Sequence, residues 1–132
     1  WALREGAPVS DQALALALEV SPSGRVLRTA GGAVEILASF EQVGGGHCRE
    51  FNRSSPGGTL DELGIACRNA QGQWRLELLV AEERSTEAGQ DRYQTASDEQ
   101  HDQADAFLRD RAVGWPLEEA EEKALIDRGW RP

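Results

Sequence analysis

The residues whose side chains are best suited to chemistry lie between His47 and Cys67. The chain has only two cysteines, Cys48 and Cys67; each is followed by arginine, and His47 precedes the first. These side chains could form a disulfide, ligate a metal or supply a thiol nucleophile. Three ligands on two predicted strands lack a recognisable zinc spacing, and neighbouring residues on a strand point to opposite faces, which separates His47 from Cys48. We therefore predict a disulfide with a surface histidine.

Carboxylates are the second candidate for chemistry. Adjacent pairs occur at residues 61–62, 82–83 and 118–119. General acid–base catalysis needs them desolvated in a cleft, whereas these pairs fall in predicted turns or first helical turns and indicate a solvated acidic surface. Glu50 is the exception because it falls on a predicted apolar face, where an edge position, a salt bridge or a local β-bulge is the simpler explanation.

Glycine clusters punctuate the first half of the chain, at residues 31–32, 44–46 and 57–58. They lack the strand-to-helix context of a phosphate-binding loop and predict turns. We expect no catalytic residue, no cofactor and no metal.

The elements that must position the cysteines are strands. Alternating apolar and polar segments joined by glycine-bearing turns predict strands over residues 34–43, 47–53, 60–68 and 73–81, with a short fifth strand at 25–29. A turn at residues 56–59 pairs Glu50 with Ile65 and Cys48 with Cys67. Directly opposed Cβ atoms are close enough for a disulfide, so the register supports the bridge independently of the cysteine count.

The same register divides the side chains of this meander between two faces. With a three-residue first turn and a four-residue third turn, Phe40 pairs with Glu50 and Trp74 with Cys67. One face then collects the apolar residues Ile36, Ala38, Phe40, Cys48, Leu63, Ile65, Cys67, Trp74, Leu76, Leu78 and Val80. The other face carries a charge ladder of Arg49, Arg68, Arg75 and Glu41, which we identify as a candidate interaction surface, with mutual pairing of these charges as the alternative to anion binding.

Helices are predicted at both ends of the chain. Ser10 can cap a helix over residues 11–19, and Ser97 can cap another over about 98–113. Pro116 suits the first turn of a third helix, which Gly129 ends. The fold class is α+β: an N-terminal helix packed on a disulfide-bonded antiparallel meander of four or five strands, plus a C-terminal helical hairpin.

Three segments follow from this organisation. Residues 1–81 form the α+β domain, 82–96 a linker or mobile loop, and 97–132 the helical hairpin, packed on the same domain or on a partner. A length of 132 residues suits one core.

Charge, hydropathy and cysteine content limit the kinds of partner and the cellular compartment that we expect. The formal net charge of −9 argues against nucleic-acid binding, and no apolar run is long enough to span a bilayer. A disulfide places the domain in an oxidising compartment. The start at Trp1 and the lack of methionine suggest an excised part of a longer protein, so we expect any membrane anchor upstream.

Several short motifs occur in a fixed order along the first two thirds of the chain: Ala17-Leu18-Glu19, Pro22-Ser23-Gly24, Phe40, Cys48-Arg49-Glu50-Phe51, Gly64-Ile65-Ala66-Cys67-Arg68 and Gly72-Gln73-Trp74. In this order they resemble the C-terminal domain of the bacterial surface-antigen family, whose members are envelope lipoproteins. The resemblance covers residues 13–80 and implies a non-catalytic domain with no active site to transfer.

The rest of the chain departs from that family. The glycine-zipper region that precedes the domain in those lipoproteins is absent, and a charged tail over residues 97–130 is added. This tail resembles the end of the extracytoplasmic portions of membrane-anchored anti-sigma factors that carry a similar module. The two resemblances imply a periplasmic or outer-envelope domain that senses or binds a protein or envelope component. A structural lipoprotein domain is the alternative, followed by a cell-envelope enzyme.

Overall fold

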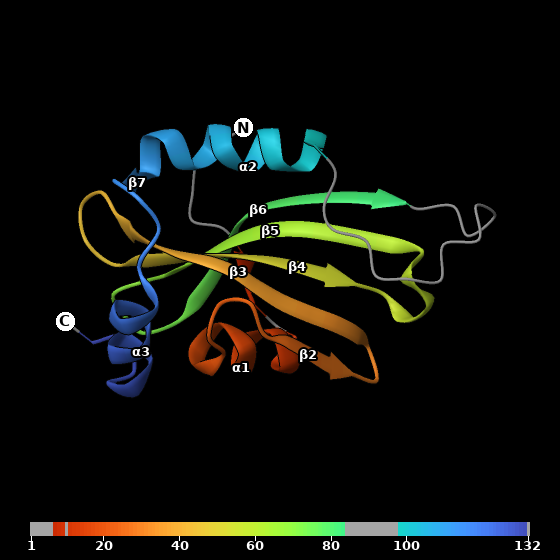
Figure 1. Ribbon diagram of the computed structural model, residues 1–132, viewed down its shortest axis with the longest axis horizontal. Coiled ribbons are helices and arrows are strands. Elements are labelled where there is room, and N and C mark those ends of the chain that lie inside the picture. Colours follow the sequence, from red (N-terminus) through yellow and green to blue (C-terminus); the bar gives the residue numbers. More distant parts are fainter. Residues whose placement is uncertain (1–6, 10, 84–97, 132) are drawn as a thin grey trace.

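A computed structural model of the chain describes residues 7–9, 11–83 and 98–131, and the elements below are those of this part (Figure 1). Its class is α+β. In chain order the elements are β1 (Ala7–Pro8), α1 (Gln12–Val20), β2 (Val26–Thr29), β3 (Gly32–Gln42), β4 (His47–Ser54), a 3₁₀ turn (Pro56–Gly58), β5 (Leu60–Arg68), β6 (Trp74–Glu83), α2 (Asp98–Arg111), β7 (Ala112–Val113) and α3 (Glu119–Asp127).

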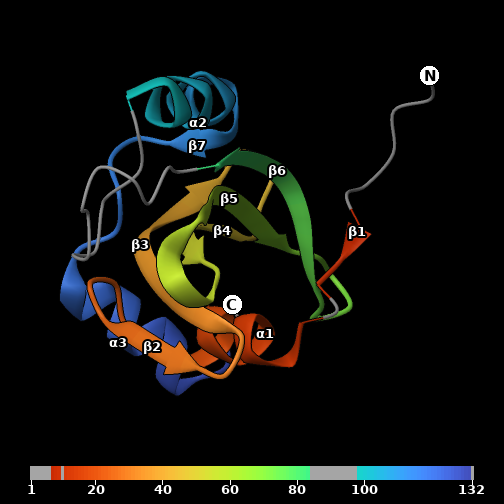
Figure 2. The ribbon, with the colours of Figure 1, turned by 90° about the vertical axis from the view of Figure 1, so that its right-hand side faces the viewer.

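The strands form one antiparallel sheet that curls around part of its own core (Figure 2). Its order is β1-β6-β5-β4-β3-β2, and β7 pairs with β3 beside this path. The predicted meander is therefore its centre, because β2 to β6 are neighbours in sequence and in space. The prediction of four or five strands was too low, since the two-residue strands β1 and β7 carry no periodicity to detect.

The register between β4 and β5 is the predicted one. Cys48 pairs with Cys67 and Glu50 with Ile65. The Cα atoms of the two cysteines are 4.0 Å apart, and a disulfide joins them. The predicted disulfide is thus confirmed.

The register of the strands that flank this pair differs from the prediction. Close to the turns, Phe40 pairs with Cys48 rather than with Glu50, and Trp74 pairs with Arg68 rather than with Cys67. Further from the turns, β3 and β4 have a bulge between Ile36 and Ala38, and β5 and β6 have one between Ile65 and Ala66. An extra residue in one strand moves the side chains beyond it to the opposite face.

The bulges divide the core between the two faces of the sheet. Ile36, Trp74 and Leu76 join the face of Phe51 instead of the face of the disulfide. The first cluster contains Leu14, Ala17, Leu18, Val34, Ile36, Phe51, Ala66, Trp74, Leu125 and Trp130. The second contains Phe40, Cys48, Leu63, Ile65, Cys67, Ala104 and Leu108.

Helices cover both faces. Helices α1 and α3 pack on the first cluster and α2 on the second, so α2 and α3 lie on opposite sides of the sheet (Figures 1 and 2). The sequence predicted that the two C-terminal helices form a hairpin. They do not pack on each other in this way, and instead clasp the edge of the sheet from both sides. We call residues 98–131 the C-terminal clasp.

Local sequence explains where α1 and α3 begin. Asp11 caps α1 by accepting hydrogen bonds from the backbone N–H groups of Ala13 and Leu14. The expected cap Ser10 lies outside the described residues, as do Ser97 and residues 84–96 of the predicted linker. Helix α3 starts three residues after Pro116, with a capping box between Glu118 and Glu121. No helix of the described part is long and apolar enough to cross a membrane.

Candidate functional site

Arg49 lies at the centre of the fold instead of on its surface. Its position on β4 directs it to the face of Phe51, between α1 and the C-terminal clasp, and its side chain is 0% exposed. The expectation that Arg49 contributes to an accessible interaction surface was therefore wrong. Ser39 of β3, rather than Glu41, lies opposite it.

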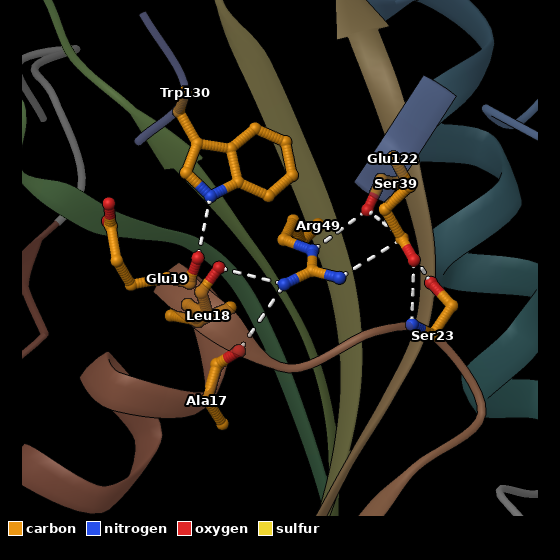
Figure 3. Close-up of polar contacts among 8 residues, drawn as sticks. All are labelled: Ala17, Leu18, Glu19, Ser23, Ser39, Arg49, Glu122 and Trp130. Carbon is orange, nitrogen blue, oxygen red and sulfur yellow. Dashed lines mark hydrogen bonds and ion pairs between the residues drawn. The ribbon is translucent and has the colours of Figure 1, made fainter. Parts of the chain in front are cut away.

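The guanidinium of Arg49 makes polar contacts in three directions (Figure 3). Nη1 donates to the carbonyl oxygens of Leu18 at 2.8 Å and Ala17 at 3.3 Å. These are carbonyls of the last turn of α1, where a helix carries partial negative charge. Nε donates to Ser39 Oγ at 2.8 Å, and Nη2 lies 3.0 Å from Glu122 Oε2.

The carboxylate of Glu122 completes the cluster from α3. It accepts hydrogen bonds from the backbone N–H of Ser23 at 2.8 Å and from the hydroxyls of Ser23 and Ser39, in addition to Arg49. Ser39 Oγ thus accepts from Arg49 and donates to Glu122. We call these four residues, Ser23, Ser39, Arg49 and Glu122, the Arg49–Glu122 network.

Burial and hydrogen bonding act in opposite directions on the acid of this network. Burial raises the pKa of Glu122, but the hydrogen bonds from Ser23 and Ser39 and the positive charge of Arg49 outweigh it and hold that pKa below its ordinary value. For Arg49 burial lowers the pKa, and the negative charge of Glu122 raises it in part. Arginine stays protonated under such shifts, so the network is a buried ion pair.

Trp130 closes the cluster from above. Its ring lies over the guanidinium, with Arg49 Cζ 5.0 Å from the ring centroid, and its Nε1 donates to the carbonyl of Glu19 at 2.9 Å. Trp74 meets it edge-on at 5.4 Å between centroids. Trp130 has a positive φ of 64°, a conformation uncommon outside glycine, which packing and this hydrogen bond hold in place.

The other predicted site residues are dispersed. Glu41 is exposed and pairs with His47, Arg68 Nε lies 3.5 Å from Glu19 Oε1, and Arg75 pairs with Pro8 of β1 and Cys67 of β5. The four-residue charge ladder is thus not a continuous surface.

Glu50 is a buried carboxylate beneath α2. It lies between Ala38 and Ile65 in the sheet and is 8% exposed. Burial raises its pKa, the charge of His101 on α2 lowers it, and Asp105 on the same helix raises it further. The β-bulge invoked for Glu50 exists, but it does not remove Glu50 from the apolar face.

Sequence reasoning missed Glu122, Ser23, Ser39 and Trp130 as a set. The available signal was Arg49 itself, because an arginine enclosed between a sheet and a helix requires an anionic partner. Its partner is 73 residues away, in a helix whose apolar stripe gave no sign of a buried acid.

Groups of three or more histidine, cysteine, aspartate or glutamate side chains suited to a metal ion do not occur within the described residues. No protein-family model matches the chain, no curated protein matches its sequence, and no solved structure matches its fold.

Proposed function

We propose that this chain is a non-catalytic domain of the bacterial cell envelope that works by binding another protein, as the extracytoplasmic part of a membrane-anchored anti-sigma factor. The proposal combines the resemblance of residues 13–80 to the surface-antigen domain with that of the tail to anti-sigma factors. It needs no active site. The polar groups that the fold gathers are occupied with one another.

The observation that carries the proposal is the contact between Arg49 and Glu122. Arg49 belongs to the Cys-Arg-Glu-aromatic motif, and Glu122 belongs to the added tail. Because the tail supplies the counter-ion of a buried arginine, it is an integral part of this fold rather than an appendage. This supports the tail-bearing class, the anti-sigma factors, over the lipoproteins without such a tail.

The disulfide supports the proposed location in the cell envelope, which is an oxidising compartment. It joins the central strands β4 and β5, where it would contribute to stability only under oxidising conditions. The test is to trap thiols in living cells of the source organism by acid quenching and then to alkylate with a polyethylene glycol maleimide. We expect no mass shift without prior reduction and a double shift after it. Two reactive thiols without reduction would contradict the envelope assignment.

The alternative function, a structural envelope lipoprotein domain, is distinguished by the gene segment encoding the residues before Trp1. One membrane helix behind a cytoplasmic segment supports the regulator. A lipoprotein signal ending in cysteine supports the alternative, and our leading proposal would then be abandoned.

A further inference from the structure

Three apolar side chains on neighbouring backbone segments are exposed where the C-terminal clasp crosses the sheet edge. Val43 is 59%, Val113 45% and Trp115 89% exposed. Glu41 pairs with Val113, and the backbone N–H of Val43 donates to the carbonyl of Arg111 at 2.8 Å. Val43 directly follows Gln42, the last paired residue of β3, so its backbone lies beside the segment that carries Val113.

Trp115 follows Val113 by two residues, in a short segment that is anchored at both ends. Before it, β7 pairs with β3; after it, the backbone N–H of Leu117 donates to the carbonyl of Ser39 at 2.8 Å. Pro116 restricts the backbone between these two points. A large aromatic side chain on a tethered backbone loses little entropy on binding, and tryptophan is the residue type most enriched at binding hot spots.

Exposed carboxylates lie close to these residues in the sheet pairing and along the chain. Glu41 lies opposite Val113, and Glu118 and Glu119 follow Trp115 by three and four residues; all three are exposed. The basic residue opposite Val43, Arg111, lies 3.8 Å from the carboxylate of Glu77, which offsets its charge. A second copy of this chain would present the same acidic border and a net charge of −9, so like charges oppose self-association here.

We propose that Val43, Val113 and Trp115 form a docking surface for a protein segment that carries arginine or lysine beside an apolar side chain. The cation lies over the indole of Trp115 and pairs with the neighbouring carboxylates, while the apolar side chain contacts the two valines. This inference rests on the proposed function, because it specifies the partner of a protein-binding domain.

The test selects random peptides displayed on phage against the full chain and measures the binding of the recovered peptides by calorimetry. We expect sequences that join lysine or arginine to an aliphatic or aromatic residue. Trp115→Ala should weaken their binding by about tenfold or more, in the range of a hot-spot residue. Leu16→Ala, at an exposed leucine of α1, is the matched apolar control and should leave binding unchanged.

A second pair of variants separates local from overall charge. Glu41→Lys with Glu119→Lys should weaken binding severalfold, whereas Glu99→Lys with Asp102→Lys, on exposed positions of α2, changes the net charge equally and should have a small effect. Equal losses in both pairs would overturn the proposal, as would acidic or neutral peptides, no recovered peptide, or binding that survives Trp115→Ala.

Analytical ultracentrifugation tests whether the chain itself dimerises through this surface. A dimer of the wild-type chain that Trp115→Ala dissociates would show that a second copy covers this surface, contrary to the proposal. If no such binding is found but Cys48 and Cys67 are oxidised in cells, the docking surface is rejected and the envelope assignment stands. If the peptides bind as expected but the two cysteines are reduced in cells, only the envelope assignment is rejected.

Discussion

The Arg49–Glu122 network is the feature of greatest energetic consequence at the scale of single residues. Removing one partner of a buried ion pair leaves an uncompensated charge, which costs more than the pair itself contributes. We expect Glu122→Gln to lower the free energy of unfolding by about 3 kcal/mol, measured by urea denaturation. Glu119→Gln, an exposed change in the same helical turn, is the control and should stay within about 0.5 kcal/mol of wild type.

The pH dependence of the same variant follows from the lowered pKa of Glu122. In acid the unfolded chain takes up a proton at this carboxyl before the folded chain does, so the stabilisation is complete above the unfolded pKa of about 4.5 and is lost as pH falls below it. The stability difference between wild type and Glu122→Gln should therefore shrink in acid. An unchanged difference down to pH 3 would argue against the lowered pKa.

The contribution of Glu50 to the pH dependence of stability has the opposite sign to that of Glu122. Its pKa is raised, so the unfolded chain loses this proton at a lower pH than the folded chain, and stability falls as pH rises from about 4.5 through the folded pKa. We expect Glu50→Gln to be more stable than wild type at pH 7 and to lose this advantage near pH 4, as measured by thermal unfolding. A less stable variant at neutral pH would show that the ionised carboxylate is stabilising beneath α2.

The disulfide acts at the scale of the elements. It closes a loop with a sequence separation of 19 residues across β4, the 3₁₀ turn and β5. The chain-entropy model gives about 3 kcal/mol for such a loop, so replacing both cysteines by alanine should lower the unfolding free energy by that amount. Reduced wild-type protein provides the comparison. A loss below about 1 kcal/mol in both would mean that the sheet alone fixes this register.

Close packing of strands gives a second prediction at this scale. A Cβ atom at Gly64 would lie 2.5 Å from Cζ of Phe51, whereas one at Gly31 would find its nearest neighbour at 3.7 Å. Gly64→Ala must displace a fully buried ring and should cost about 1–3 kcal/mol, while Gly31→Ala should have little effect. Equal melting temperatures of the two variants would contradict this account of the Phe51 pocket.

The sheet also shows what periodicity can and cannot predict. The β4–β5 register follows from the alternation on both sides of the 3₁₀ turn and from the opposed cysteines. The bulges between Ile36 and Ala38 and between Ile65 and Ala66 do not, since a single extra residue leaves the local pattern intact. On either side of the second bulge, Trp74 and Leu76 lie on the face of Phe51, which α3 covers, and Leu78 lies on the face of the disulfide. Glu122 could not be predicted because its role depends on this change of face.

At the scale of the whole molecule, the C-terminal clasp reaches both faces by different chemistry. Helix α2 is held by apolar contacts and by Gln100, whose Nε2 donates to the carbonyl of Val80 at 2.9 Å. Helix α3 is held by the Arg49–Glu122 network and by Trp130. Because the two helices share no packed interface, they should respond separately to substitutions.

The most direct test of the central claim, that the buried polar cluster joins the clasp to the sheet, is amide hydrogen exchange of the full chain at pH 7 with Glu122→Gln. We expect faster exchange in α3 and in the last turn of α1, whose carbonyls Arg49 binds, with α2 unchanged. Glu119→Gln should exchange like wild type. Unchanged protection of α3 in Glu122→Gln, or equal loss in α2 and α3, would contradict the claim.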